Sequence, residues 1–366
     1  MSAGSSSRFR DKNTPKKQWL RINDDPLWLF VTSRFTKMYN FGEILITASK
    51  EDVRYMKNYT NYKIVEGGDT RAKSLLNALE YVETEYVLVS DTARACIPES
   101  VIKRVLEQKG EGDCIVPYLP VSDTTVYNDQ YIDRNRIKLI QTPQLSRASM
   151  LKKGLKNSIE STDESSAIKA IGGEVIYILG DTKSHKLTFQ EDYDLLDCLS
   201  PPKSVIFTGN GLDFHKFEDG KKMVLGGVEI ESDFGFKAHS DGDVLLHALS
   251  DALLGAIGGG DIGEWFPDND LQYKGIDSAT LLKQITYFIV SVGYEIINID
   301  ITMICETPRL SNYKDAIKEN LANLLEIQKN RINIKATTTE KMGFLGRQEG
   351  AGCSVSANLR YYRWKK

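Results

Sequence analysis

The sequence predicts an α/β protein of two domains, and three observations carry this prediction. Short apolar runs alternate with helical patterns through the first 200 residues, which is typical of a doubly wound, largely parallel sheet. Two consecutive prolines, Pro201 and Pro202, interrupt this pattern, and a second series of strands and helices follows them. At 366 residues the chain is also longer than a single hydrophobic core usually supports.

The first domain has five strand candidates with helical segments between them. The candidates are 43-EILITA-48, 62-YKIV-65, 85-EYVLVS-90, 113-DCIVP-117 and 174-EVIYIL-179. In the helical segment 69–82, Asp69 is placed as the N-cap, and three leucines with Val82 form one apolar stripe. Ligands of doubly wound sheets bind at the carboxyl ends of the strands, so we expect a site there.

The second domain starts again with a strand. We place a first domain at 1–200, a linker at 201–204 and a second domain at 205–366. The predicted elements are a strand at 204-SVIFTGN-210, helices near 241–257 and 277–292, and a last alternating strand at 353-CSVSANLRYY-362. This half therefore reads as an α/β domain of its own, and no internal repeat relates it to the first.

Composition and charge limit the classes of function. A net charge of -3, with 27% charged and 41% hydrophobic residues, is typical of a soluble globular protein and indicates neither a nucleic-acid nor a membrane partner. No apolar run is long enough to span a membrane and the N-terminus has no signal core, so we expect a cytoplasmic protein. The cysteines, at positions 96, 114, 198, 305 and 353, are odd in number and lack C-x-x-C spacing. We therefore expect neither a disulfide framework nor a zinc ribbon.

The N-terminus has the composition of a phosphate-binding loop. In 1-MSAGSSSRF-9, small residues expose successive backbone N–H groups, and Arg8 and Lys17 add positive charge. Because such N-termini are more often disordered, the loop alone is a weak signal. Other polar segments strengthen it, namely 67-GGDTRAKS-74, 90-SDTAR-94, 123-DTT-125, 133-DRN-135, 142-TPQ-144, 162-TDE-164 and 186-KLTFQED-192. In order and spacing these segments resemble the 2-C-methyl-D-erythritol 4-phosphate cytidylyltransferase family over residues 1–195.

This resemblance implies a reaction and a set of residue roles. The family joins methylerythritol 4-phosphate to the α-phosphate of CTP and releases pyrophosphate, a transfer that depends on positioning and charge neutralisation. It implies that Arg8 and Lys17 stabilise the α-phosphate in the transition state, with Lys16 as the alternative to Lys17. Asp91 would hold Mg²⁺, which prefers oxygen ligands. Asp69, Arg71 and Ser74 would frame the cytidine, Thr124, Arg134, Thr142 and Lys186 would bind and aim the methylerythritol phosphate, and Gly4, Ser5 and Arg94 would complete the substrate contacts.

Three features depart from the pattern of this family. Ser6 stands where the family has a second glycine, and 90-SDTARA-95 replaces an HDAARP-like segment. The family also begins with an apolar strand before the phosphate loop, and here that strand is missing. A doubly wound sheet without it loses ladder hydrogen bonds and a large apolar face. We therefore expect that the natural reading frame starts upstream or that the strand has been lost, and the mass and activity of natively expressed protein test this.

Three of the four histidines lie between residues 215 and 247. Asp213 and His215, two apart in an extended segment, point to the same side of the chain. His247 recurs with Asp243 and Asp251 on one face of a predicted helix. One aspartate and two histidines make a three-ligand set for Zn²⁺ with an open position for substrate. The alternative is that these histidines satisfy local hydrogen bonds, and a hydrolytic metalloenzyme is a further option, although the H-E-x-x-H motif is absent.

The motifs downstream resemble a second family. They are 238-AHSDGD-243, 260-GDIG-263, 266-FPDND-270, 305-CETPRL-310 and 335-KATTTEK-341, and 211-GLDFH-215 departs only slightly from the usual G-F-D-V-H. Three consecutive threonines also suit a β-strand, but the charged residues around them suit a phosphate and metal site better. Over residues 205–363 the chain resembles 2-C-methyl-D-erythritol 2,4-cyclodiphosphate synthase.

The second resemblance implies that a 2-phosphate attacks the β-phosphate of a cytidine diphosphate intermediate and expels CMP. Asp213, His215 and His247 would bind Zn²⁺ or another divalent transition metal. Glu340 would reach a Mg²⁺ that bridges the α- and β-phosphates, while His239 and Thr338 would stabilise charge on the transferring group. The other implied substrate contacts are Ser240, Asp261, Ile262, Gly263, Phe266, Asp268, Asp270, Thr307, Pro308, Arg309, Thr337, Thr339, Phe344 and Arg347.

Both halves point to one pathway and to cytidine nucleotides, so the chain resembles a bifunctional fusion of the two enzymes. The resemblance implies a homotrimer, formed through the second domain, and a separate ATP-dependent kinase for the intervening step. Two alternatives remain for the first half: a different sugar-phosphate nucleotidyltransferase, or a non-catalytic assembly module on an active synthase. Turnover of CTP against other nucleotides with methylerythritol phosphate tests the first alternative, and pyrophosphate release tests the second.

Overall fold

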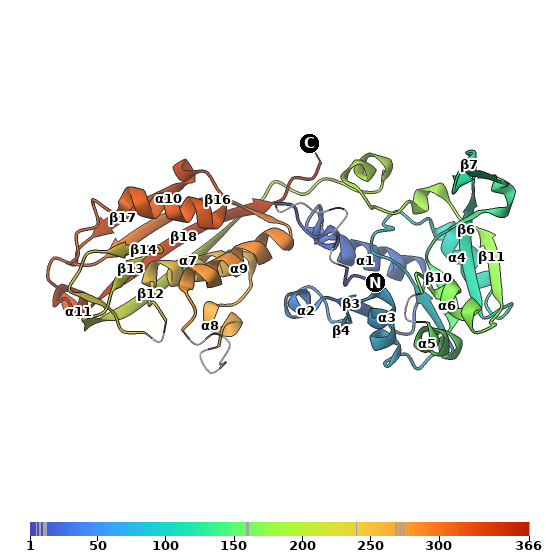
Figure 1. Cartoon of the computed structure of the whole chain (residues 1–366), viewed down its shortest axis with the longest axis horizontal. Coiled ribbons are helices and arrows are strands. Elements are labelled where there is room, and N and C mark those ends of the chain that lie inside the picture. The colour runs from blue at the N-terminus through green and yellow to red at the C-terminus, as the bar shows by residue number, and fades with distance from the viewer. Residues whose placement is uncertain are drawn as a thin grey trace. The chain divides into compact units, whose positions relative to one another are not determined.

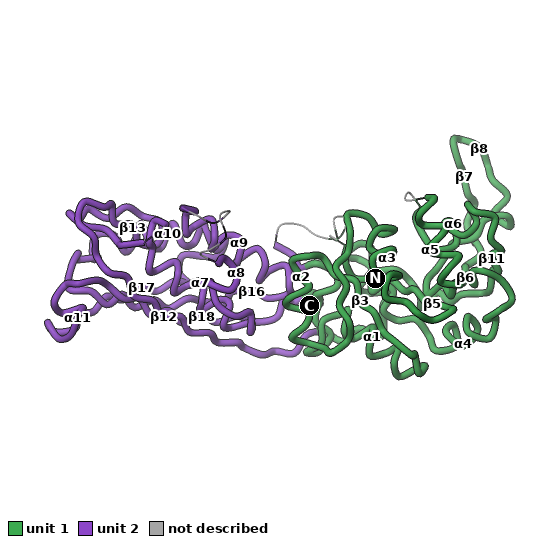
Figure 2. Tube along the Cα trace, turned by 90° about the horizontal axis from the view of Figure 1, so that it is seen from below, with its two compact units in different colours: residues 1–12, 16–201, 364–366 green, residues 13–15, 202–363 purple. Residues whose placement is uncertain are grey.

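The structure, a computed structural model, is a mixed α/β protein, as the sequence predicts. It describes residues 1–4, 6, 9, 13–158, 161–238, 240–267, 270, 273 and 275–365. The chain divides into two compact units (Figure 1, Figure 2). Unit 1 comprises residues 1–12, 16–201 and 364–366, and unit 2 comprises residues 13–15 and 202–363. The C-terminal end of the chain therefore belongs to the same unit as the N-terminus.

Unit 1 is built on a mixed sheet. Its strands are β5 (Tyr86–Val89), β6 (Cys114–Pro120), β9 (Lys138–Ile140), β10 (Gln144–Arg147) and β11 (Val175–Leu179). The strand order is β11-β6-β10-β5, and β9 also pairs with β6. The expectation of a largely parallel sheet is wrong here, because β10, which the sequence analysis did not predict, runs antiparallel to both β5 and β6. Only the β11–β6 pair of this sheet is parallel among the described strands.

Helices cover both faces of this sheet, which is the doubly wound arrangement. Cys114 and Val116 of β6 pack against α3, α5 and α6, whereas Ile115 points to the other face and packs against α4. The helices of unit 1 are α1 (Leu27–Met38), α2 (Lys50–Met56), α3 (Arg71–Leu79), α4 (Glu99–Glu107), α5 (Ala148–Asn157) and α6 (Glu164–Ala170). Alternate residues of one strand thus support two separate hydrophobic clusters.

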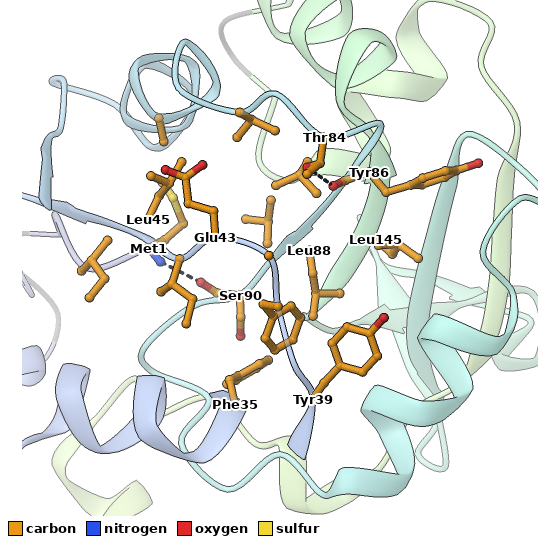
Figure 3. A pocket seen from close by; sticks show the side chains of 18 of the residues that line it. Met1, Phe35, Tyr39, Glu43, Leu45, Thr84, Tyr86, Leu88, Ser90 and Leu145 are labelled. Carbon is orange, nitrogen blue, oxygen red and sulfur yellow. Dashed lines mark hydrogen bonds between the residues drawn. The ribbon is translucent and has the colours of Figure 1, made fainter. Parts of the chain in front are cut away.

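A largely apolar cavity of about 450 Å³ lies in unit 1 (Figure 3). Its lining comes from α1, α3, β5 and β3 (Leu45–Ala48), and β3 forms a separate parallel pair with β4 (Lys63–Glu66). Leu45 and Leu88 are among the side chains that face it.

The first two residues of the chain bond to β3 and to the residue after β5. The Met1 ammonium donates to Ser90 O at 2.8 Å and Ser2 N donates to Thr47 O at 3.1 Å. Among the described residues, β3 and β5 each pair with one strand only.

Unit 2 is a five-stranded sheet with helices packed on it. The strand order is β15-β12-β18-β16-β17, and the bounds are β12 (Ile206–Asp219), β15 (Phe234–Phe236), β16 (Tyr294–Ile304), β17 (Ile332–Thr337) and β18 (Gly350–Tyr361). α7 (Val244–Ile257) packs against β12 and β18, and α9 (Ser278–Ser291) packs against α7. α10 (Lys314–Leu325) packs against β17, and β13 (Met223–Leu225) pairs with β14 (Val228–Ile230). The long strand β12 and the helix α7 carry the cluster of aspartate and histidine residues described below.

Glycines in β12 allow α7 to approach the sheet closely. Gly209 and Gly211 both face this helix, and a Cβ on Gly211 would lie only 1.9 Å from Ala248 O. A side chain at either position would therefore separate the helix from the strand. The close approach brings His247, the residue before Ala248, beside residues 213–215 of β12.

Two further expectations about unit 1 are wrong. Thr70, not Asp69, is the N-cap of α3, because the helix begins at Arg71 and the Thr70 side chain accepts a hydrogen bond from Lys73 N. Cys96 and Cys198 form a disulfide, although they are 102 residues apart in sequence, because the fold brings their Cα atoms to 5.6 Å. Within the described residues, no helix is long and apolar enough to cross a membrane.

Candidate active sites

Asp91 is the centre of a charged cluster in unit 1, two residues beyond the carboxyl end of β5. Its Oδ1 lies 3.2 Å from Arg71 Nη2, and its Oδ2 lies 2.8 Å from Lys186 Nζ. Burial would raise the pKa of Asp91, but the charges of Arg71 and Lys186 hold it well below its ordinary value. Asp91 is therefore ionised and is positioned by two cations from distant parts of the sequence.

Glu164 belongs to this cluster, and the sequence analysis gave it no role. Its carboxylate is fully buried at the start of α6 and lies 2.7 Å from Arg71 Nη1. Burial raises the pKa of Glu164, and the Arg71 guanidinium opposes this rise. Arg71 is thus held from two sides, by Asp91 and by Glu164. The segment 162-TDE-164 was a motif of the family pattern, but only the fold reveals that Glu164 pairs with Arg71.

A polar cavity of about 450 Å³ surrounds this cluster. Five predicted site residues line it, namely Arg71, Asp91, Arg94, Thr142 and Lys186. Arg94 donates to Ser184 O and Ile140 O, and Thr142 Oγ1 accepts from Asp91 N at 3.4 Å. The sequence analysis therefore selected residues that the fold gathers around one cavity.

Four other predicted residues of the first domain lie away from this cavity lining. Asp69 is exposed, and Ser74 is buried, with its hydroxyl 2.9 Å from Thr70 O and 3.1 Å from Gly68 O, either of which can accept its single proton. Thr124 and Arg134 flank the exposed hairpin of β7 (Thr125–Tyr127) and β8 (Gln130–Ile132). Within the described residues of a single chain, neither Thr124 nor Arg134 lines the cavity around Asp91.

The N-terminal loop is described only in part, and Ser5 and Arg8 lie outside the described residues. Gln18 Nε2 donates to Gly4 O at 3.1 Å, and Lys17 N donates to Ser6 Oγ at 3.0 Å. Ser6 has φ 61°, a left-handed conformation that glycine adopts freely. The family's glycine at this position thus matches the backbone shape that Ser6 adopts.

The two candidate lysines point to different surroundings. Lys16 is buried, and its Nζ lies 3.0 Å from Asp52 Oδ1 and 3.3 Å from Glu51 Oε2. Lys17 Nζ donates to Leu187 O at 2.9 Å, next to Lys186 of the charged cluster. Lys16 is therefore committed to a buried ion pair, whereas Lys17 points toward the residues around Asp91.

Asp213, His215 and His247 form the metal-ligand cluster of unit 2. One ligand atom from each lies within 4.8 Å of the others, and these residues are half-buried. Asp213 Oδ2 is 3.1 Å from His215 Nδ1 and 3.3 Å from His247 Nδ1. Asp213 Oδ2 and His215 Nδ1 are buried atoms without a hydrogen-bond partner among the described residues. Atoms arranged in this way suit a bound cation.

The cluster also shifts the pKa values of its members. Burial would raise the pKa of Asp213, but His215 and His247 hold it well below its ordinary value. Burial would lower the pKa of His247, but Asp213 and the nearby aspartates raise it above its ordinary value. Without a metal, these shifts favour an ionised Asp213 carboxylate beside a protonated His247 ring.

A second layer of residues orients His247. Ser278 Oγ lies 2.9 Å from His247 Nε2, and the same hydroxyl donates to Asp241 Oδ1. Asp243 and Asp251, which share the helical face of His247, serve the fold instead. Asp243 accepts from three backbone N–H groups, and Asp251 Oδ1 accepts from Ile262 N. The sequence analysis found this helical face but not the role of Ser278.

Residues 261–264 are tethered beside this cluster. Asp261 caps α8 (Ile262–Trp265) by accepting from Glu264 N, and the bond from Ile262 N to Asp251 ties the same turn to α7. Gly263 lies within α8, and Phe266, which follows it, is buried. Asp270 and Ser240 are described, whereas His239 and Asp268 lie outside the described residues. The roles assigned to His239 and Asp268 therefore stay predictions.

The loops at the ends of β16 and β17 are held together by Glu306. Its Oε1 accepts from Thr339 N, Thr339 Oγ1 and Lys341 N at 3.0–3.1 Å. The predicted residues on these loops are Thr307, Pro308, Arg309, Thr337, Thr338, Thr339, Glu340, Phe344 and Arg347. Glu340 is exposed and is not part of the cluster around Asp213. Phe344 contacts Phe214 of β12, with ring centroids 5.8 Å apart.

Comparison with known proteins gives the family. The model of 2-C-methyl-D-erythritol 4-phosphate cytidylyltransferase matches residues 1–199, and that of the YgbB family matches residues 206–360. The bifunctional enzyme IspD/IspF of Aliarcobacter butzleri is 53% identical over 367 residues, which cover 100% of this chain and 98% of that protein. The chain belongs to the family of bifunctional IspD/IspF enzymes. It therefore combines a cytidylyltransferase and a cyclodiphosphate synthase, and no finding favours the non-catalytic alternative for its first half.

Other IspD/IspF proteins agree with this assignment. The bifunctional enzyme of Sulfurimonas denitrificans is 52% identical over 366 residues, which cover 100% of this chain and 94% of that protein. The structure of the bifunctional IspDF from Campylobacter jejuni superposes with a TM-score of 0.89 and 47% identity, covering 100% of this chain and 98% of that chain. The IspD/IspF fold therefore extends over both units.

Proposed function

We propose that the two activities use two separate sites, the Asp91 cavity of unit 1 and the Asp213–His215–His247 cluster of unit 2. The metal-ligand cluster is the observation that carries the proposal, because three donor atoms from a strand and a helix converge within 4.8 Å. The domain of residues 1–200 transfers the cytidylyl group, and the domain of residues 205–366 forms the cyclic diphosphate. Residues 201–204 are the linker between the two domains.

In the first site, the chain's own residues neutralise phosphate charge and position the substrates. Asp91 is an ionised carboxylate and would hold Mg²⁺, a hard cation that would neutralise phosphate charge when bound. Arg71 and Lys186 supply positive charge at the same cavity. Between the two lysines, the buried pairing of Lys16 with Asp52 supports Lys17 as the group that reaches the α-phosphate with Arg8.

In the second site, Asp213, His215 and His247 would hold Zn²⁺. When bound, this ion would act as a Lewis acid on a phosphate oxygen. Ser278 keeps the His247 ring oriented so that Nδ1 faces Asp213 and not the solvent. Glu340 would reach a Mg²⁺ on the diphosphate, and the loop held by Glu306 would carry the nucleotide contacts.

The exposure of several predicted site residues supports an oligomer in which subunits complete each other's sites. Glu340 and Phe344 are exposed within one chain, as are Thr124 and Arg134 on the hairpin of unit 1. A homotrimer through unit 2 is the assembly we propose. The intervening phosphorylation requires a separate kinase.

The test combines two substitutions with both assays. His247→Ala is expected to lose bound zinc and cyclisation while cytidylyl transfer persists, because His247 belongs to the cluster of unit 2 only. His185→Ala is the matched control, since His185 lies in unit 1 and bonds to Asp192 at 2.9 Å. Retention of zinc and cyclisation by the His247→Ala variant would contradict the proposal, and loss of both activities without unfolding would contradict two independent sites.

A further inference from the structure

Trp364 lies beyond both family matches, which end at residues 199 and 360. It follows β18 by three residues but belongs to unit 1. Its side chain is buried, with only 7% of its surface exposed, and its indole Nε1 donates to Arg21 O at 2.7 Å. A buried tryptophan with a satisfied N–H is an ordered anchor, so this end of the chain is fixed to unit 1.

The indole of Trp364 is the first of three aromatic rings that lead to the N-terminal loop. Its ring centroid is 4.8 Å from that of Tyr193, in the 3-10 helix Gln190–Leu195. Tyr193 meets Phe9 edge-on at 5.6 Å. Phe9 is 3% exposed, and its backbone carbonyl accepts from Gln190 Nε2 at 3.4 Å. The series Trp364–Tyr193–Phe9 therefore connects the C-terminal tail to the loop that contains Arg8.

Trp364 also contacts the segment that follows Lys17 in the sequence. Arg21, whose carbonyl it binds, lies four residues after Lys17. Lys17 Nζ is 5.9 Å from the centroid of the Phe9 ring. Trp364 thus contacts both Arg21, which follows Lys17, and Tyr193, whose ring packs against Phe9.

We propose that Trp364 is a positioning residue of the cytidylyltransferase site, which holds Phe9 of the N-terminal loop and Lys17 in place for CTP. This inference rests on the proposed role of that loop in binding the triphosphate. A loop of small residues loses conformational freedom when it binds a ligand, and a preformed loop loses less. Trp364 contacts Tyr193 and Arg21, and it acts on Phe9 through the Tyr193 ring.

The test uses substitutions in the full chain with both reactions assayed. Trp364→Ala is expected to raise KM for CTP about tenfold or more, because small displacements of binding groups have large effects. The KM for methylerythritol phosphate and the cyclisation rate are expected to stay unchanged. Trp364→Phe keeps a ring against Tyr193 and is expected to restore most of the affinity for CTP. Lys365→Ala, an exposed neighbour in the same tail, is the matched control and is expected to behave as wild type.

A second variant separates positioning from general stability. Tyr193→Leu removes the middle ring and is expected to raise KM for CTP as Trp364→Ala does, with little further effect when the two are combined. An unchanged KM for CTP in Trp364→Ala would overturn the inference. An equal rise in KM for CTP and for methylerythritol phosphate, together with slower cyclisation, would also overturn it. If Arg8→Ala also leaves CTP turnover unchanged, the proposed role of the loop fails. A chain that is sensitive to Arg8→Ala but not to Trp364→Ala rejects the role of Trp364 alone.

Discussion

Ser278 Oγ lies 2.9 Å from His247 Nε2, so that the other ring nitrogen, Nδ1, faces Asp213 Oδ2 at 3.3 Å. The serine hydroxyl is itself bonded to Asp241 Oδ1. This arrangement fixes both the ring orientation and the nitrogen that is offered to a metal. Ser278 is the first residue of α9, and His247 is on α7, so the packing of two helices determines the ligand geometry.

Removal of the Ser278 hydroxyl is expected to weaken zinc binding. Ser278→Ala leaves the His247 ring without its partner, and loss of such an outer contact costs about 10- to 100-fold in metal affinity. Competition with a zinc chelator measures this change. Ser291→Ala, at the other end of the same helix, is the control, because its hydroxyl bonds only to Phe288 O among the described residues. Equal zinc affinity in both variants would show that Ser278 does not orient the ligand.

Zinc is expected to stabilise the protein more at pH 8 than at pH 6. In the metal-free protein the pKa of His247 is raised, so the protonated ring stabilises the fold below the unfolded pKa of about 6.5. This contribution is lost as pH rises through the folded value. Zinc requires the neutral ring, so protons compete with it at low pH. Asp213, with its pKa lowered, stays ionised throughout this range.

Thermal unfolding with and without a chelator checks this prediction between pH 6 and pH 8. The increase in Tm caused by zinc is expected to grow with pH in wild type and to be absent from His247→Ala. An increase in Tm that is the same at both pH values would contradict proton competition at His247.

The metal-ligand cluster could be predicted because its members belong to short-range patterns. Asp213 and His215 are two apart in a strand, and the helical spacing around His247 is visible in the sequence. The support of His247 could not be predicted, because Ser278 is 31 residues away in the sequence. The same holds for the loops at the ends of β16 and β17, where Thr339 is 33 residues from Glu306. No local pattern connects partners that meet only through tertiary packing.

The same limit explains the errors in the fold. β10 has only four residues, 144-QLSR-147, and its polar side chains Gln144 and Ser146 are buried, so it lacks the apolar alternation of a strand. Cys96 and Cys198 have no recognisable spacing in the sequence. By contrast, the apolar runs of β5, β6 and β11 were found, because each is a continuous run of apolar and aromatic residues that is visible in the sequence.

The disulfide predicts a specific count of reactive thiols. Three cysteines of the described structure are free, namely Cys114, Cys305 and Cys353. Denatured, unreduced protein is therefore expected to react with a thiol reagent at three positions and reduced protein at five. A bond that closes a loop of this length stabilises a fold by about 5 kcal/mol in the chain-entropy model, so reductant should lower Tm. Five thiols without reductant would show that Cys96 and Cys198 are unlinked.

The close contact between β12 and α7 makes Gly211 a sensitive position. A Cβ at residue 211 would lie 1.9 Å from Ala248 O, a backbone atom that cannot rotate away, so Gly211→Ala must move α7 off the strand. Overpacking of this kind costs about 3 kcal/mol, and here it also displaces His247 from Asp213. We expect a lower free energy of unfolding in urea and weaker zinc binding, with cytidylyl transfer retained. Gly255→Ala on the same helix is the control, because its nearest neighbour, Asn210 O, is 4.0 Å away and alanine favours a helix. Normal zinc affinity in Gly211→Ala would mean that the cluster tolerates a wider spacing between strand and helix.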